Sequence, residues 1–549
     1  MDAKNAIAKI LKKEGVEFVT GFPRNVLHEA LAEEGIRFIK FRTERVAINV
    51  AEGFSRANFG KRIGVSVVQY GPGIENGFGG VAHAFADSVP ILVIPGGYPR
   101  RRNVVPNFNS VKNFREVTKW VDVINFADRT EDMMRRAFNY LKNGRPGPVM
   151  LELPSDVATE EFVDSEFNYR PIKRSRTMGD PADVRKAAKA LINAKNPIIR
   201  AGAGVLYAQA WDELLELAEL LQIPVFTTIN GKSAFPESHP LALGCGGMSR
   251  PEMVMHFLRK ADLVFAIGSS CTIEPFTTPL PSKRTIIQST IDERDINKDY
   301  DVEYAIIGDA KLVLRQLINE IKGQLKSNSI DKENSTKKEI RKVKNKWLEK
   351  WMPKLTSNQI PINPYRVISD IMKALDEKQT IITHDSGSPR EQMTPFYVSD
   401  TPGGYIGWGK STTLGQGLGL AIGAKLACPE KTVVNVMGDA AFGMVGMDFE
   451  SAVRERIPII TIVYNNSKLG GYGKDFPVAS EKYGLNIISG NYSKIAEGLG
   501  AGYVERVVEP SEIVSAILRA KKSLESGKPS FLEIMTEEET EFSSSPLKW

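Results

Sequence analysis

Short apolar runs alternate with longer amphipathic segments along most of this chain. Such runs are typical of strands buried on both faces, and the amphipathic segments fit helices that cross from one strand to the next. The pattern predicts strands at Val16–Thr20, Ile63–Gln69, Ile91–Pro95 and Val149–Leu153, at Pro197–Ala201, Pro224–Thr228, Leu263–Ile267 and Thr285–Ser289, and at Thr380–Thr383, Thr432–Met437, Ile459–Tyr464 and Ser530–Met535.

The alternation falls into three blocks, which indicate three domains. Strand–helix alternation within a block favours a doubly wound parallel sheet, so the predicted fold class is α/β with three such domains. We place the domains at residues 1–170, 182–325 and 361–549. The segment 171–181, rich in Arg, Lys and Pro, separates the first two. We interpret the charged linker at 326–360 as a solvated helix between domains and not as a binding patch.

Composition sets limits on the class of protein. The chain has 549 residues, 42% of them hydrophobic, which is too many for a single core. No apolar run reaches 18 residues and Met1–Lys4 does not resemble a signal peptide, so we expect a cytoplasmic protein without a membrane span. Three distant cysteines (Cys245, Cys271 and Cys428) fit a reducing compartment. The net charge of +6 does not argue for a nucleic-acid partner.

The most informative segment runs from Gly438 to Asn466. A predicted strand ends at Gly438, a helix is expected over Met444–Arg454, and a second buried strand over Ile457–Tyr464. This βαβ unit would bring Asp439 and Asn466 together at the carboxyl ends of two parallel strands, where ligands bind in open α/β sheets.

The residue types at this edge suit a metal-bound diphosphate. The oxygens of Asp439 and Asn466 are hard donors that Mg²⁺ accepts. The small residues Gly438, Ala440 and Ala441 would let phosphate oxygens approach backbone N–H groups at a helix start. The alternative is an ordinary βαβ crossover with a turn aspartate and an asparagine pair at a strand end.

This spacing resembles the metal–diphosphate motif of thiamine diphosphate (ThDP) enzymes, in which Gly-Asp-Gly/Ala precedes an Asn-Asn pair. The run from Glu44 to Pro90 and the segment Leu151–Pro154 are similar to the acetohydroxyacid synthase (acetolactate synthase) and pyruvate oxidase branch. The resemblance extends over nearly the whole chain. It implies pyrimidine-binding, middle and diphosphate-binding domains, and a homodimer or homotetramer with active sites at subunit interfaces.

The resemblance also implies residue roles. ThDP chemistry needs a carboxylate beside N1′ of the aminopyrimidine ring, and Glu44 matches that catalytic position; taken alone, Glu44 would more often be a salt-bridged residue at a helix start. Asp439, Asn466 and the carbonyl of Lys468 match the Mg²⁺ ligands. The other cofactor-binding positions are Gly73, Asn76, Gly387, Ser388, Thr412, Leu414, Gly438, Ala440 and Ala441.

The chain departs from the pattern of that family at several positions. The segment Gly268–Cys271 lacks the arginine with which acetohydroxyacid synthases hold FAD, so FAD is not expected. Asp475 replaces a tryptophan that selects 2-ketobutyrate in those synthases. Arg24 replaces a glycine that faces the reacting carbon in that family, and we assign it to the substrate; pairing with Glu29 is the alternative. The run Arg100–Arg102 could meet a charged tail such as CoA, but a solvated loop is favoured.

These features imply a ThDP- and Mg²⁺-dependent enzyme that acts on a 2-oxo acid or related acyl donor by decarboxylation, carboligation or both, as acetolactate synthases do. Three alternatives stay open. One is a ThDP-dependent lyase or decarboxylase of an acyl-CoA or hydroxy-ketone, and the second is a non-catalytic protein of the same fold. The third is a nicotinamide-dependent oxidoreductase, although Gly202-Ala203-Gly204 lacks a third glycine at the expected spacing.

Overall fold

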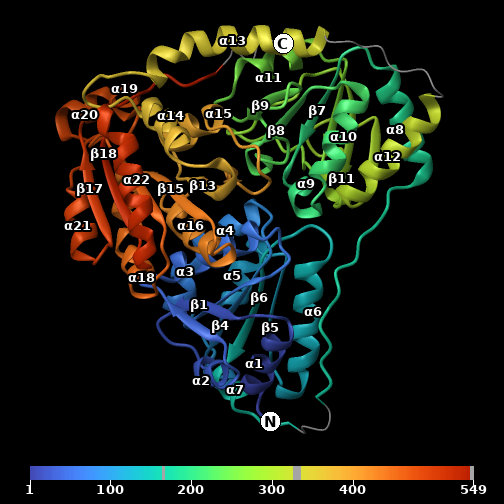
Figure 1. Ribbon diagram of the computed structural model, residues 1–549. Helices are drawn as coiled ribbons and strands as arrows, with labels where there is room; N and C mark the ends of the chain where they lie inside the picture. Colours follow the sequence, from blue (N-terminus) through green and yellow to red (C-terminus); the bar gives the residue numbers. More distant parts are fainter. Residues whose placement is uncertain (163–166, 326–334, 545–549) are drawn as a thin grey trace.

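The protein consists of three α/β domains, seen in the computed structural model, which describes residues 1–162, 167–325 and 335–544. In Figure 1 the N-terminal domain (blue) lies at the bottom, the middle domain (green) at the upper right and the C-terminal domain (orange to red) at the left. Each is built on a six-stranded sheet whose paired strands are all parallel. The predicted fold class is therefore confirmed. Among the described residues, no helix has the length and apolar character needed to cross a membrane.

The N-terminal sheet has the strand order β2-β1-β3-β4-β6-β5. Its strands are β1 (Phe18–Phe22), β2 (Arg37–Lys40), β3 (Gly64–Val68), β4 (Ile91–Gly97), β5 (Trp120–Val123) and β6 (Val149–Pro154). The helices are α1 (Ala3–Lys13), α2 (His28–Glu33), α3 (Glu44–Ala57), α4 (Pro72–Ala86), α5 (Ser110–Phe114), α6 (Thr130–Lys142) and α7 (Ser155–Ala158). The segment 167–180 runs up one side of the molecule to the middle domain (Figure 1).

The C-terminal sheet repeats the same topology, with the order β14-β13-β15-β16-β18-β17. Its strands are β13 (Thr380–His384), β14 (Tyr405–Ile406), β15 (Thr432–Gly438), β16 (Ile460–Asn465), β17 (Tyr503–Val507) and β18 (Ser530–Met535). The helices are α14 (Pro364–Ala374), α15 (Ser388–Phe396), α16 (Gln416–Ala427), α17 (Asp439–Val445), α18 (Phe449–Arg454), α19 (Tyr472–Asp475), α20 (Pro477–Tyr483), α21 (Tyr492–Gly498) and α22 (Ile513–Ser523).

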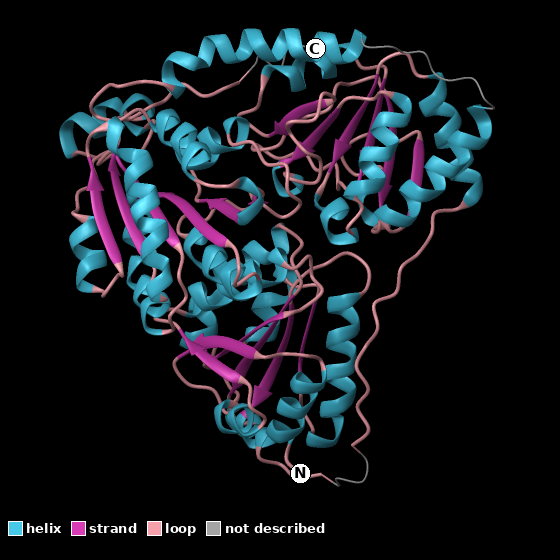
Figure 2. Cartoon of the chain, viewed as in Figure 1, coloured by secondary structure: helices cyan, strands magenta, loops and turns pink. Residues whose placement is uncertain are grey.

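The middle sheet has a different order, β12-β11-β10-β7-β8-β9. Its strands are β7 (Pro197–Ala201), β8 (Val225–Thr228), β9 (Ala242–Gly246), β10 (Leu263–Ile267), β11 (Thr285–Thr290) and β12 (Tyr304–Ile307). The helices are α8 (Pro181–Asn193), α9 (Ala203–Ala208), α10 (Trp211–Leu221), α11 (Glu252–Lys260) and α12 (Ala310–Leu325). Figure 2 shows that helices flank the strands in all three domains.

Two predicted helices differ from the structure. The helix expected over Met444–Arg454 is two helices, α17 and α18, joined by the 3₁₀ turn η8 (Gly446–Asp448). The first begins at Asp439, directly after β15, where Ala440 and Ala441 favour helix. The charged linker forms α13 (Ser335–Leu355), whose Trp347 stacks on Phe396 at 4.8 Å. One face of this helix is therefore buried, whereas only a solvated helix was predicted.

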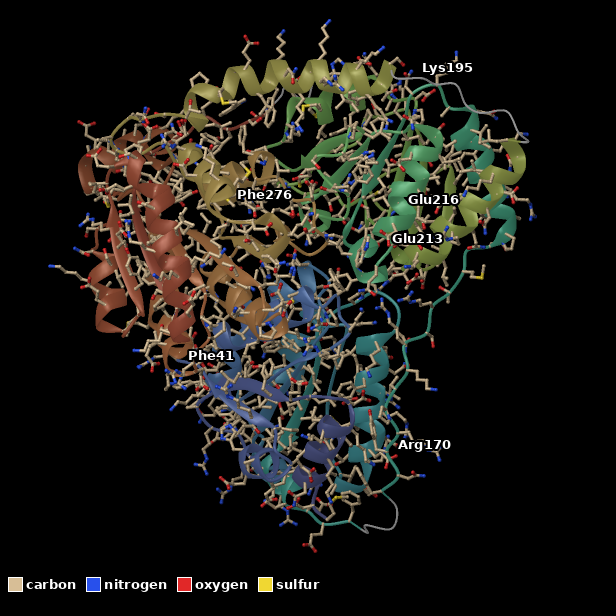
Figure 3. The ribbon with its side chains drawn as sticks, in the orientation of Figure 1. Phe41, Arg170, Lys195, Glu213, Glu216 and Phe276 are labelled. Carbon is tan, nitrogen blue, oxygen red and sulfur yellow. The ribbon has the colours of Figure 1, made fainter. Side chains whose placement is uncertain are left out.

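The N-terminal and C-terminal domains meet through α3 and α16, which approach so closely that glycine is required at the contact. A Cβ on Gly53 would lie 2.3 Å from the carbonyl oxygen of Leu420, and a Cβ on Gly423 would lie 2.1 Å from that of Val50. The apolar core around this contact draws residues from both domains, including the fully buried Phe41. Figure 3 places Phe41 where the blue N-terminal domain adjoins the C-terminal one.

We expect Gly423→Ala to lower the stability of the protein, because its methyl group cannot fit against the Val50 carbonyl without separating α3 from α16. Overpacking of this kind costs about 1–3 kcal/mol. Thermal unfolding followed by circular dichroism measures the loss. Gly323→Ala is the matched control, because Gly323 also lies in a helix but has no atom within 4 Å of an added Cβ. Equal melting temperatures for the two variants would contradict the close contact.

Candidate functional site

Most of the predicted cofactor residues lie at one point on the carboxyl edge of the C-terminal sheet. The chain leaves β13 towards β14 on one side and leaves β15 towards β16 on the other, so the edge between β13 and β15 is a topological switch point, the usual ligand position in open sheets. Gly387 and Ser388 follow β13, whereas Gly438 ends β15. A Cβ on Gly387 or Gly438 would meet no atom within 4 Å, so open space lies above both backbones.

The predicted metal ligands are brought together on this edge. Asp439 accepts hydrogen bonds from the backbone N–H of Ala440 (2.8 Å) and Ser467 (2.8 Å), which ties the end of β15 to the loop after β16. In that loop Asn466 accepts from the backbone N–H of Lys468 at 2.9 Å. Burial raises the pKa of Asp439 against the backbone N–H groups that it accepts from. A buried carboxylate without an ion-pair partner among the described residues suits a cation, so this donor set fits Mg²⁺.

The loop that contains Lys468 and Gly470 also faces the β13 side of the site. A Cβ on Gly470 would lie 2.9 Å from the hydroxyl oxygen of Ser388. The segments after β13, β15 and β16 therefore surround one space, and Ser388 begins α15, whose first backbone N–H groups have no intrahelical partner. This arrangement can bind the oxygens of a diphosphate.

Asp385, to which no role was assigned from the sequence, joins two of these segments to each other. Its fully buried carboxylate accepts from the backbone N–H of Ser386 (2.8 Å), Gly415 (2.9 Å) and Gly417 (2.8 Å). Burial raises the pKa of Asp385, and the three N–H donors oppose that shift. The contact joins the Gly387–Ser388 loop to the segment that carries Thr412 and Leu414, both of which are half-buried.

Glu44, the predicted catalytic residue, begins α3 at the carboxyl edge of the N-terminal sheet. Its side chain is buried (4% exposed) and accepts a long hydrogen bond of 3.4 Å from the amide of Asn76. A Cβ on Gly73 would lie 3.3 Å from a carboxylate oxygen of Glu44. Burial raises the pKa of Glu44, although its own backbone N–H and Asn76 act in the opposite direction. The structure thus groups Glu44, Gly73 and Asn76.

The Glu44 group lies against the C-terminal domain of the same chain. Thr43 directly precedes Glu44, and its hydroxyl donates a hydrogen bond of 2.8 Å to the carboxylate of Asp448. Asp448 belongs to the turn that follows α17. Arg45 directly follows Glu44, and its guanidinium donates a hydrogen bond to the carbonyl of Leu414. One polypeptide therefore brings the Glu44 helix to the cofactor segment around Leu414. Active sites shared between two subunits stay a prediction.

The arginines singled out by the sequence have different surroundings. Arg24 follows β1, is exposed, and forms no ion pair or hydrogen bond within the described ranges 1–162, 167–325 and 335–544, so the proposed pairing with Glu29 is not seen. Arg100, in contrast, binds Asp156 at 2.9 Å and Glu160 at 2.7 Å. Because two carboxylates balance its charge, Arg100 belongs to a surface ion cluster, as the favoured interpretation of that run expected.

A second cavity lies at the switch point of the middle sheet and was not predicted. Gly202–Gly204, after β7, and Gly268–Ser270, after β10, line an empty volume of about 1150 Å³ that is partly open to solvent. Basic side chains from all three domains reach it: Arg145, Arg174, Arg200 and Lys410. Burial lowers the pKa of Lys410 to about 8. The cavity adjoins the Gly268–Cys271 segment on which the expectation of no FAD was based, and that expectation stays a prediction.

Comparison with known proteins agrees with the geometry. The chain matches three family models: the N-terminal TPP binding domain of thiamine pyrophosphate enzymes over residues 1–120, their central domain over 184–317 and their C-terminal TPP binding domain over 385–534. A probable acetolactate synthase large subunit of Methanococcus aeolicus is 32% identical over 95% of this chain and 90% of its own length.

Two bacterial relatives extend the comparison. The acetolactate synthase isozyme 3 large subunit of Escherichia coli (strain K12) is 29% identical over 84% of this chain and 82% of its own length. The glyoxylate carboligase of Escherichia coli O157:H7 is 28% identical over 99% of this chain and 94% of its own. These matches disagree with the nicotinamide-dependent alternative, which was wrong.

We expect Asp385→Ala to weaken both the fold and the site, because it leaves three buried backbone N–H groups without an acceptor. Each such group costs about 1–3 kcal/mol. Thermal unfolding and ThDP titration measure the two effects. Asp376→Ala is the control, because Asp376 accepts only one comparable N–H bond, at an exposed 3₁₀ turn. If both variants melt and bind alike, Asp385 does not hold the two segments together.

Proposed function

The chain belongs to the thiamine pyrophosphate (ThDP) enzymes, which form or cleave C–C bonds, and on that premise we propose that it is a Mg²⁺-dependent, acetolactate synthase-like carboligase. Its donor would be a 2-oxo acid or related acyl compound that loses CO₂, and its acceptor a second carbonyl compound. One observation carries the proposal: the helix that begins at Glu44 packs against the segment carrying Leu414, beside the Asp439–Asn466 edge. A protein that only bound the cofactor would have no need of the Glu44 carboxylate.

The chain's own residues divide the task. Asp439, Asn466 and the Lys468 carbonyl would hold Mg²⁺, and the backbone at Gly387, Ser388, Gly438, Ala440 and Ala441 would hold the diphosphate. Leu414 would support the ring system from below, beside the Thr412 carbonyl. Bound ThDP would supply the electron sink for breaking and forming the carbon–carbon bond.

Glu44 would move the proton that this chemistry requires. A side chain is an effective acid or base when its pKa lies near the working pH. Burial raises the pKa of Glu44 from that of an ordinary glutamate and so towards neutrality. Asn76 donates to one oxygen of the carboxylate and leaves the other free to exchange a proton with a ring nitrogen.

We also propose that the protein is a homodimer or homotetramer in a reducing cytoplasm. Some large apolar side chains are exposed at the surface: Phe78 and Phe85 on α4 are about 40% exposed, and Tyr483 at the end of α20 is 85% exposed. A partner subunit that covered these side chains would remove their apolar surface from water. The free cysteines Cys245 and Cys271 are buried, which fits a compartment without disulfide formation.

Removal of Mg²⁺ should weaken ThDP binding, because the diphosphate and Asp439 would repel each other without a cation between them. We expect at least a tenfold difference in Kd between Mg²⁺ and EDTA for the wild type, measured by isothermal titration calorimetry. Asp439→Ala should remove most of that difference. Asp183→Ala deletes a surface carboxylate and should leave it intact. Equal binding in EDTA would overturn the metal assignment.

Glu44→Gln should abolish turnover but leave ThDP binding within a few-fold of the wild type, because the amide keeps the shape of the side chain and loses its proton transfer. A loss of about 10²–10⁴-fold in kcat is expected. Product analysis by mass spectrometry with a panel of 2-oxo acids and aldehydes measures it. Glu33→Gln, on the exposed face of α2, is the control. Full activity in the Glu44 variant would remove the proposed base.

A further inference from the structure

Arg24 lies at the switch point of the N-terminal sheet. The chain leaves β1 towards β2 and leaves β3 towards β4, so connections diverge at the carboxyl edge between β1 and β3. Arg24 follows β1, and the segment with Gly73 and Asn76 follows β3. Glu44 follows β2, the neighbour of β1 on the same edge. Arg24 therefore shares the edge with every N-terminal residue assigned to the reaction.

The loop that carries Arg24 is held firmly. The side chain of the next residue, Asn25, is buried and donates to the carbonyls of Val68 (2.8 Å), the last residue of β3, and Ile94 (3.0 Å), in the middle of β4. Its carbonyl oxygen accepts from the backbone N–H of Leu27 at 3.0 Å. Three hydrogen bonds from one side chain thus anchor the loop across two neighbouring strands, so Arg24 projects from a rigid support.

The charge of Arg24 is not balanced. Its guanidinium has no ion-pair or hydrogen-bond partner in the part of the chain that the structure describes, and it is exposed. Its neighbours on the edge differ: Arg42 pairs with Glu450 at 3.0 Å, and Arg45 donates to the Leu414 carbonyl. A rigidly supported guanidinium with free donors is a ready bidentate binder of carboxylate, sulfonate or phosphonate.

We propose that Arg24 binds an anionic group that the donor substrate keeps throughout turnover, so that the donor is a 2-oxo acid with a second anion. This inference rests on the proposed function and narrows its substrate class. The carboxylate that leaves as CO₂ is the wrong partner for Arg24. That group loses its charge in the transition state, and an interaction stronger in the ground state than in the transition state slows the reaction.

An anionic group at the far end of the donor, unlike the leaving carboxylate, does not lose its charge in the transition state. A sulfonate, phosphonate or second carboxylate keeps its charge from binding to product release. Arg24 therefore binds the ground state and the transition state equally, which lowers KM without raising the barrier. The residue selects the substrate and positions it, while Glu44 serves proton transfer.

The test compares donors with and without the second anion. Wild-type holoenzyme, Arg24→Gln and Arg24→Lys are assayed with pyruvate and 2-oxobutyrate on one side and with sulfopyruvate, phosphonopyruvate, oxaloacetate and 2-oxoglutarate on the other. We expect Arg24→Gln to lose about 10- to 100-fold in kcat/KM for at least one dianionic donor, mainly through KM, and to change little for the monoanions. Arg24→Lys should recover part of the loss, because lysine restores the positive charge but not the planar guanidinium that binds an anion through two hydrogen bonds.

A binding measurement separates recognition from catalysis. In the Glu44→Gln background, titration calorimetry with the preferred dianion should show weaker binding when Arg24→Gln is added. Arg185→Gln, which removes an exposed arginine on α8 of the middle domain, is the matched control and should leave both readouts unchanged.

The outcomes distinguish a failure of the Arg24 role from a failure of the proposed function. A wild-type enzyme that prefers monoanionic donors, or an Arg24→Gln variant that loses activity equally on both groups of donors, overturns the role of Arg24 and leaves the proposed function standing. A wild-type holoenzyme that turns over no 2-oxo acid overturns the proposed function, and this inference with it.

Discussion

The contact between α3 and α16 is the constraint on which the site depends. Each helix follows the second strand of its sheet, and the two sheets have the same strand order. The helices can approach only because Gly53, Gly419 and Gly423 present no side chain at the crossing. Their first turns then lie together, as the bond from Arg45 to the Leu414 carbonyl shows. The proposed catalytic carboxylate and the proposed cofactor segment, from opposite ends of the chain, are thus positioned by backbone sterics.

Buried charges make the same interface specific. Glu52 of α3 accepts from Gln416 of α16 at 2.8 Å and from His83 at 2.9 Å. Arg56 pairs with Asp87 at 3.0 Å beside them. Burial alone would lower the pKa of His83, but the charge and hydrogen bond of Glu52, together with the charge of Asp87, raise that pKa overall. The carboxylates of Glu52 and Asp87 lie close enough to His83 to form a metal site, yet the Arg56 guanidinium supplies the positive charge there. Such groups are costly to bury unless all partners are in place, so they disfavour any other docking of the two domains.

The sequence predicted the interior of each sheet better than its edges. The strands that it located are mostly central ones such as β3, β10 and β16, which are buried along their whole length and therefore read as continuous apolar runs. The edge strands β5, β12 and β17 were missed, because they bury few residues and carry polar ones. At the site, the sequence predicted the residues that belong to a local motif, such as Asp439 and Asn466. The structure brings these two residues together. Asp385 and Arg45 join segments through tertiary contacts, with backbone groups that lie 30 and 369 positions away, and no local pattern could reveal those contacts.

The N-terminal and C-terminal sheets have matching topology, so their different proposed roles depend on which residues stand at equivalent positions. Equivalent helices, α3 and α16, begin at equivalent edges, but their first residues differ in kind. Glu44 opens α3 with a buried acid whose pKa is raised, whereas Gly415 precedes α16 with a left-handed backbone (φ +87°) that only glycine adopts easily. One edge therefore carries the proposed proton-transfer group, and the other carries an open backbone with free N–H donors. A ligand between the two edges needs both, because chemistry at one end requires its other end to be held. Arg24 lies on the same sheet edge as Glu44. It would add a fixed positive charge for the part of the substrate that does not react.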